Sequence, residues 1–89
     1  MENNKVKKLA EQLADLYLQS YDTYEPMVED ACSRLITEAE LEFLFDHLLD
    51  VCQYHKNDEL FFELCETYNG VYTNCVNYYK NLHKEIYEN

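Results

Sequence analysis

The sequence has almost none of the residues that turn a chain sharply. Its 89 residues include one Gly and one Pro. An all-β fold needs such residues between many short strands, so this composition argues against one. The length allows a single domain, residues 1–89, and is too short for a doubly wound nucleotide-binding fold. We therefore expect an all-α protein.

Basic residues are also scarce. The chain has 7 Lys and Arg against 18 Asp and Glu, which gives a formal net charge of −11. DNA, RNA and anionic membranes attract basic surfaces, so we expect none of them as a direct partner. The hydrophobic content of 47% is nevertheless high enough to predict a folded domain rather than a disordered chain.

Long apolar segments are missing too. No run of roughly 18 apolar residues exists to span a bilayer. The N-terminus leads directly into an amphipathic segment, without the apolar stretch of a signal peptide. We predict a cytoplasmic location, either in the organism itself or in an infected host cell.

The sequence contains no motif for catalysis or cofactor binding. There is no Gly-rich phosphate loop, no nucleophile elbow and no His-Glu-x-x-His zinc motif. We therefore predict a protein that is not an enzyme, with no catalytic residues and no cofactor.

The four cysteines include no Cys-x-x-Cys pair. Each falls on or beside the apolar stripe of a predicted helix, so we expect buried, reduced thiols and no bound metal. The alternative is a zinc site with ligands from two helix faces. Its four ligands would be Cys52, His55, Cys75 and His83.

The spacing of apolar residues predicts five helices. Their approximate ranges are 4–21, 25–35, 38–55, 59–68 and 71–87. The expected architecture is a compact bundle of four to five short helices in a helical-hairpin arrangement. Its clearest boundary is a capping box at residues 37–40, flanked by Ile36 and Leu41 in the hydrophobic-staple positions.

Four further residues set the remaining predicted boundaries. Residues 22–26 break and restart the chain, with Pro26 tolerated in the first turn of the second helix. Asn57 closes the third helix and Asp58 caps the fourth. Gly70 ends the fourth helix by taking a positive φ, which costs glycine no steric strain.

The second half of the chain has a pattern of apolar residues similar to that of the first half. A shift of 34 residues aligns Leu41 with Cys75 and Phe45 with Tyr79. Residues 70–82, with Gly70, Tyr72, Cys75, Val76, Tyr78, Tyr79 and Leu82, resemble the second helix of a tetratricopeptide repeat. The resemblance covers one hairpin and implies a helical-hairpin architecture.

The strongest functional signal lies in the helix predicted over residues 38–55. Four carboxylates follow one another at one-turn spacing, and we call them the acidic ridge: Glu38, Glu42, Asp46 and Asp50. Like charges at this spacing oppose the helix by about 0.2–0.5 kcal/mol per pair. No Lys or Arg between Arg34 and Lys56 offsets them. The carboxylates repeat about every 6 Å along the helix, which approaches the phosphate spacing of a nucleic-acid strand.

Aromatic side chains are predicted beside the acidic ridge, where they would anchor a protein interface. We call them the aromatic edge: Phe43, His47, Tyr54 and Tyr78. The alternative for the ridge is a plain solvent-exposed face that only keeps the protein soluble.

These features predict a protein-binding module. The first hypothesis is an inhibitor that occupies the basic, nucleic-acid-binding surface of a partner protein. In size and charge the chain resembles phage and mobile-element counter-defence proteins, including anti-CRISPR proteins and DNA mimics. The second hypothesis is a tetratricopeptide-like adaptor that holds a peptide or helix in a groove. The third is a homodimer formed through Phe43, His47 and Tyr54.

Overall fold

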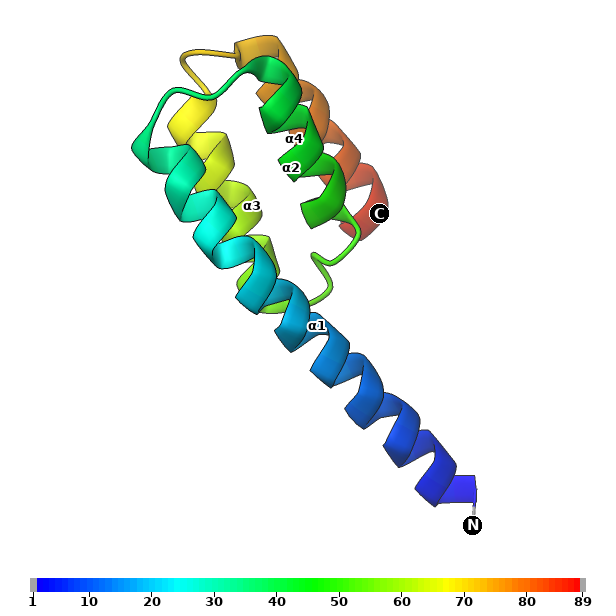
Figure 1. Ribbon diagram of the computed structural model, residues 1–89. Helices are drawn as coiled ribbons and strands as arrows, with labels where there is room; N and C mark the ends of the chain where they lie inside the picture. The colour runs from blue at the N-terminus through cyan, green and yellow to red at the C-terminus, as the bar shows by residue number, and fades with distance from the viewer. Residues whose placement is uncertain (1, 89) are drawn as a thin grey trace.

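The computed structural model describes the backbone of residues 2–88 and the side chains of residues 7–9, 11, 12 and 15–88. The described chain contains four helices and no strand: α1 (Glu2–Ser33), α2 (Glu38–Leu49), α3 (His55–Tyr68) and α4 (Thr73–Tyr87). The prediction of an all-α helical bundle is confirmed (Figure 1). None of these helices has the length and apolar character that crossing a membrane requires.

Helix α1 merges two of the predicted helices, so the break expected at residues 22–26 is wrong. The helix runs through Pro26 without interruption. An interior proline removes a backbone hydrogen bond and crowds the preceding turn, at a cost of about 3 kcal/mol or more. Packing on the rest of the bundle offsets this cost, because Val28 and Ala31, just after the proline, are buried in the core.

The N-terminal half of α1 projects from the bundle (Figure 1). It makes the molecule 53 Å long against a smallest dimension of 17 Å. Leu9 and Leu16 in this half are 59% and 57% exposed. Tyr17 contacts the bundle, because its ring stacks on the ring of Tyr54 with a centroid distance of 6.5 Å.

Helix α2 begins as predicted. Thr37 Oγ1 accepts a hydrogen bond from the Glu40 N–H at 3.1 Å, and Glu40 Oε2 accepts one from the Thr37 N–H at 3.2 Å. This reciprocal capping box satisfies two backbone donors that a helix otherwise leaves free at its N-terminus. The staple residues Ile36 and Leu41 are both buried, which fixes the direction in which the chain enters the helix.

Helix α2 ends at Leu49, earlier than predicted, and α3 begins at His55. Asn57, expected to close the earlier helix, instead lies fully buried in the first turn of α3. Its Nδ2 donates to the Val51 carbonyl at 3.2 Å. This side-chain bond satisfies a carbonyl of the α2–α3 turn, so the backbone can leave the helix there.

Two predicted caps are also wrong. Asp58 does not cap α3, because Tyr54 holds the N-cap position and makes no side-chain capping bond. Gly70 does not end α3 with a positive φ, since no residue of the described chain has one. The N–H groups of Val71 and Tyr72 instead bond to the Tyr68 carbonyl at 3.1 and 2.9 Å.

The four helices form two hairpins, α1–α2 and α3–α4, and the second hairpin stacks in parallel on the first. The C-terminal half of α1 lies along α3, and α2 lies along α4 (Figure 1). The rings of Phe45 in α2 and Tyr79 in α4 stack with centroids 4.9 Å apart. The 34-residue shift aligns these two positions, so the similar pattern in the two halves of the sequence corresponds to one hairpin packed on the other.

The core fills the space among α2, α3, α4 and the second half of α1. Its largest fully buried apolar side chains come from all four helices: Val28, Leu41, Phe45, Leu48, Phe61, Leu64, Tyr68 and Val76.

Tyr68 joins the second hairpin to the end of α1. Its hydroxyl oxygen lies 2.5 Å from the Ala31 carbonyl and 2.6 Å from the Arg34 carbonyl. It also accepts a hydrogen bond from the Ile36 N–H at 3.2 Å. The carbonyls at a helix C-terminus lack partners within the helix. This buried hydroxyl has one proton, so it caps one of the two carbonyls at a time.

Two other tyrosines act in the same way. The Tyr72 hydroxyl donates to the Ile36 carbonyl at 2.8 Å, in the α1–α2 connection. The Tyr87 hydroxyl donates to the Leu49 carbonyl at the end of α2. The second hairpin thus satisfies carbonyls at the end of α1, in the α1–α2 connection and at the end of α2.

We expect Tyr68→Phe to lower the free energy of unfolding by about 1–3 kcal/mol, because it leaves buried backbone groups without a partner and changes little else. Urea unfolding followed by circular dichroism measures the effect. Tyr78→Phe is the matched control, since Tyr78 is 59% exposed. Equal stability of the two variants would contradict the capping role of Tyr68.

Candidate functional site

The acidic ridge lies where α2 meets α4. Glu38 and Glu42 line a shallow groove of about 500 Å³ together with Cys75, Tyr78 and Tyr79 of α4. All four ridge residues are exposed at the surface. Helix α4 therefore forms a second wall beside the ridge, with the Cys75 thiol and the two tyrosines. This wall was not predicted from the sequence.

Asp46 continues the ridge beyond this groove. Its Oδ1 accepts a hydrogen bond from the Tyr79 hydroxyl at 2.7 Å. Asp50 is the C-cap residue of α2, and its N–H bonds to the Leu48 carbonyl. Asp50 is also close enough to act electrostatically on the Tyr87 hydroxyl of α4. The ridge thus follows α4 from its first turn to its last.

The groove has a negative electrostatic field. Burial, together with the charges of Glu42, Glu38 and Asp46, raises the pKa of the Cys75 thiol. Burial and the hydrogen bond to Asp46 raise the pKa of Tyr79. No Lys or Arg is among the groove's lining residues, and no ion pair found among the described side chains includes a ridge carboxylate.

Only Tyr78 of the predicted aromatic edge lines this groove. Phe43 and His47 lie next to each other, with ring centroids 4.1 Å apart. Phe43 faces a different hollow, between α1 and α2. Tyr54 lies in the α2–α3 turn and packs edge-to-face against Tyr21 of α1. The edge is therefore split between two sides of the molecule.

Three tyrosines of α1 extend Phe43, His47 and Tyr54 into a longer row of rings. The ring of Tyr24 lies 6.1 Å from that of His47, and the rings of Tyr17 and Tyr21 both contact Tyr54. We call this the aromatic row. This row could not be predicted with a break at residues 22–26, because Tyr21 and Tyr24 share a helix face only when α1 is continuous.

A second hollow lies between α1 and α2, and its lining is mostly apolar. Its volume is about 460 Å³, and its walls include Met27, Ile36, Phe43 and Leu44. Arg34 borders it and pairs with Asp30 at 2.9 Å and with Glu40 at 3.7 Å.

The four zinc ligands considered from the sequence do not all come together. His55 begins α3 with its side chain 83% exposed, and it pairs with Glu59 at 3.0 Å. Cys75 lies in the acidic groove. Cys52 and His55 do not share a helix face, because α2 ends before both residues and α3 begins at His55.

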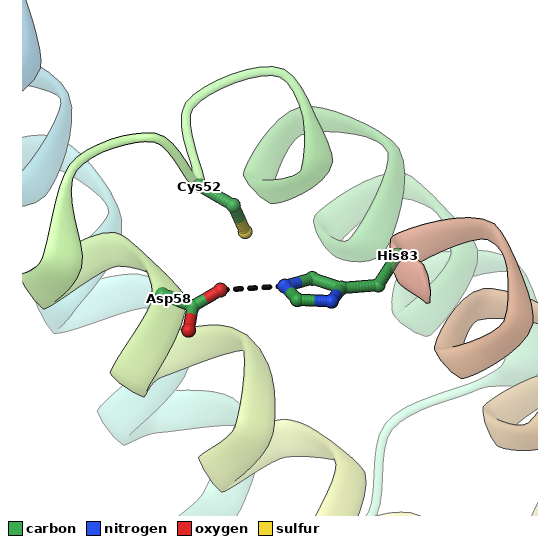
Figure 2. Close-up of side chains that lie close together, drawn as sticks. All are labelled: Cys52, Asp58 and His83. Carbon is green, nitrogen blue, oxygen red and sulfur yellow. Dashed lines mark hydrogen bonds and ion pairs between the residues drawn. The ribbon is translucent and has the colours of Figure 1, made fainter. Parts of the chain in front are cut away.

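Cys52 and His83 do meet, and Asp58 is the third member of their cluster (Figure 2). His83 Nε2–H donates to Asp58 Oδ1 at 2.5 Å. Burial, reinforced by the Asp58 carboxylate, raises the pKa of the Cys52 thiol to about 12. All four cysteines of the chain are free thiols.

Comparison with known protein families, curated proteins and solved structures gives no match to this chain. Three features of the described structure are candidate functional sites. They are the acidic groove between α2 and α4, the aromatic row along α1, and the buried cluster of Cys52, Asp58 and His83.

The buried Cys65 thiol gives a testable dependence of stability on pH. Burial raises its pKa from 9.0 to about 12. Above pH 9 the unfolded thiol ionises while the folded one stays protonated, so the stability it contributes is lost as the pH rises towards 12.

We expect the free energy of unfolding of the wild type to fall more steeply between about pH 9 and pH 11 than that of Cys65→Ala. The difference in slope approaches about 1.4 kcal/mol per pH unit. Urea unfolding at several pH values measures both slopes. Equal slopes for the two proteins would contradict this prediction, because they would mean that the Cys65 thiol has the same pKa in the folded and unfolded states.

Proposed function

We propose that this protein is a non-enzymatic binding module that occupies a basic surface of a partner protein. The observation that carries the proposal is the exposed acidic ridge of α2, set against the tyrosine-lined groove of α4 with no basic residue in its lining. Carboxylates one turn apart repel one another and weaken the helix slightly. A basic partner would relieve this repulsion, and the relief would favour binding.

The ridge and the tyrosines have different roles in the proposed complex. Clustered carboxylates accelerate association with a basic surface, because they attract it over distances near the Debye length. Tyr78 is 59% exposed at the border of the groove and supplies an aromatic contact that slows dissociation. Arg or Lys side chains of the partner would lie between Glu38 and Glu42.

A nucleic-acid-binding surface is the partner surface that we favour. Such surfaces carry rows of Arg and Lys that bind successive phosphates, and the ridge offers successive carboxylates about 6 Å apart along the helix. An inhibitor of this kind excludes the nucleic acid by occupying its site, as phage counter-defence proteins and DNA mimics do. It would act in the cytoplasm of the organism or of an infected host.

We expect charge reversal in the groove to abolish capture of the partner. The variant Glu38→Lys/Glu42→Lys keeps the hydrogen bond between Asp46 and Tyr79 intact. The matched control is Glu63→Lys/Glu66→Lys, which changes the net charge equally at exposed positions of α3. Affinity capture from lysate, followed by mass spectrometry, compares the two with the wild type.

The captured partner should also be released by salt and by added duplex DNA, since both compete for basic side chains. The proposal fails if the partner resists both treatments and binds the groove variant as well as the control. Loss of capture in Phe43→Ser alone would instead place the partner in the apolar hollow between α1 and α2. That result would favour the tetratricopeptide-like adaptor.

A second candidate function is self-association through α1. Its N-terminal half projects from the bundle (Figure 1). Leu9 and Leu16 in this half are exposed, which leaves apolar surface in water unless another chain covers it. Exposed Lys7 and Lys8 precede exposed Asp15 along this half. An antiparallel second copy would bring opposite charges together and cover the leucines. This surface differs from the homodimer face predicted from the sequence.

We expect Leu9→Glu/Leu16→Glu to lower the molar mass in sedimentation equilibrium from that of a dimer to that of a monomer. The helical signal of the bundle should remain, because both positions lie outside the core. A wild type that sediments as a monomer at high micromolar concentration rules this candidate out.

A further inference from the structure

A cluster outside the acidic groove joins three separate parts of the chain. Cys52 comes from the α2–α3 turn, Asp58 from the first turn of α3, and His83 from α4 (Figure 2). One donor atom of each residue lies within 4.8 Å of the other two. Cys52 and His83 are only 6% and 5% exposed, while the side chain of Asp58 is 31% exposed.

Aromatic packing fixes the ring of His83. Phe61 stacks on it and Phe62 meets it edge-on, both with centroids 4.9 Å away. Tyr87 lies 5.1 Å away. These rings leave Nε2 pointing towards Asp58 (Figure 2). A fixed imidazole is a better metal ligand, because little freedom is lost when its nitrogen binds an ion.

The arrangement suits metal binding better than nucleophilic catalysis. A Cys-His-Asp triad needs the acid and the thiol at opposite nitrogens of the imidazole. Here Asp58 already binds Nε2, and the sulfur of Cys52 lies on the same side of the ring (Figure 2). Sulfur, nitrogen and oxygen therefore converge on one point, as the ligands of a metal ion do.

We propose that Cys52, Asp58 and His83 bind a Zn²⁺ ion, with the fourth position open to water. Zinc accepts thiolate, imidazole and carboxylate ligands together, whereas Mg²⁺ and Ca²⁺ prefer oxygen alone. Neighbouring ligands of a tetrahedral zinc ion are about 3.3–3.7 Å apart, so His83 and Asp58 need to separate by roughly 1 Å. The partly exposed Asp58 provides the route of entry.

A second group of side chains, Glu38, Glu42 and Cys75, also brings three donor atoms within this range. It contains no histidine, and its two carboxylates are exposed. Exposed acidic groups lie together on many proteins without holding an ion. This group therefore serves as the internal comparison for the zinc site.

Zinc at the proposed site would tie the α2–α3 turn to both helices of the second hairpin. A ligand that binds only the folded state stabilises it by mass action. We expect Zn²⁺ to raise the melting temperature of the full chain and to slow amide exchange across residues 50–58. The inference is independent of the proposed function, since the cluster contains no residue of the acidic ridge.

Titration of the metal-free full chain with Co²⁺ tests the site, because thiolate-bound tetrahedral Co²⁺ absorbs visible and near-ultraviolet light. We expect one Co²⁺ per chain, with a sulfur-to-metal band that added Zn²⁺ removes. Cys52→Ser should abolish the band, and Asp58→Asn should weaken binding by about tenfold or more. Cys75→Ser is the matched control and should keep the band.

A second measurement needs no variant. Histidine ring signals in the nuclear magnetic resonance spectrum of the wild type should respond to Zn²⁺ at His83, while those of His47 and His55 stay in place. The proposal is overturned if the Co²⁺ band is absent, if Cys75→Ser removes it, or if Zn²⁺ shifts His55 instead. Any of these results leaves the cluster as a buried His–Asp pair beside a thiol.

Discussion

The fold depends on tyrosine hydroxyls that satisfy the carbonyls of helix ends. The described chain has no residue with positive φ, so none of its helices ends in the left-handed glycine turn that commonly serves this purpose. Tyr68, Tyr72 and Tyr87 supply the partners from the other hairpin. Each bond spans more than thirty residues of sequence, so the ends of α1 and α2 are completed only when the second hairpin is in place.

The stacking of the two hairpins explains how the surfaces arise. Tyr68, Tyr72 and Tyr87 reach from the second hairpin to the end of α1, the α1–α2 connection and the end of α2, and in the same arrangement α2 lies along α4. That pairing sets the acidic ridge against Cys75, Tyr78 and Tyr79. It also brings His83 to the α2–α3 turn, where Cys52 and Asp58 lie. The acidic groove and the buried cluster therefore have a common structural origin.

Features that depend on neighbouring residues could be predicted well. The capping box of Thr37 and Glu40 formed because both partners lie within one turn. The apolar face of α2 and the one-turn spacing of the ridge follow from helical periodicity. The end of α2 could not be predicted in this way. It depends on Asn57, whose side chain reaches back to the Val51 carbonyl only after the chain has turned.

The sequence by itself determined the helical class, the net charge of −11 and the row of carboxylates on α2, because these depend on composition and on periods of a few residues. The tertiary structure alone decided that α1 continues through Pro26, since the packing of Val28 and Ala31 outweighs a local penalty. It also decided that Cys52 meets Asp58 and His83 rather than His55. Contacts between distant residues carry no local signal, so only the folded chain reveals them.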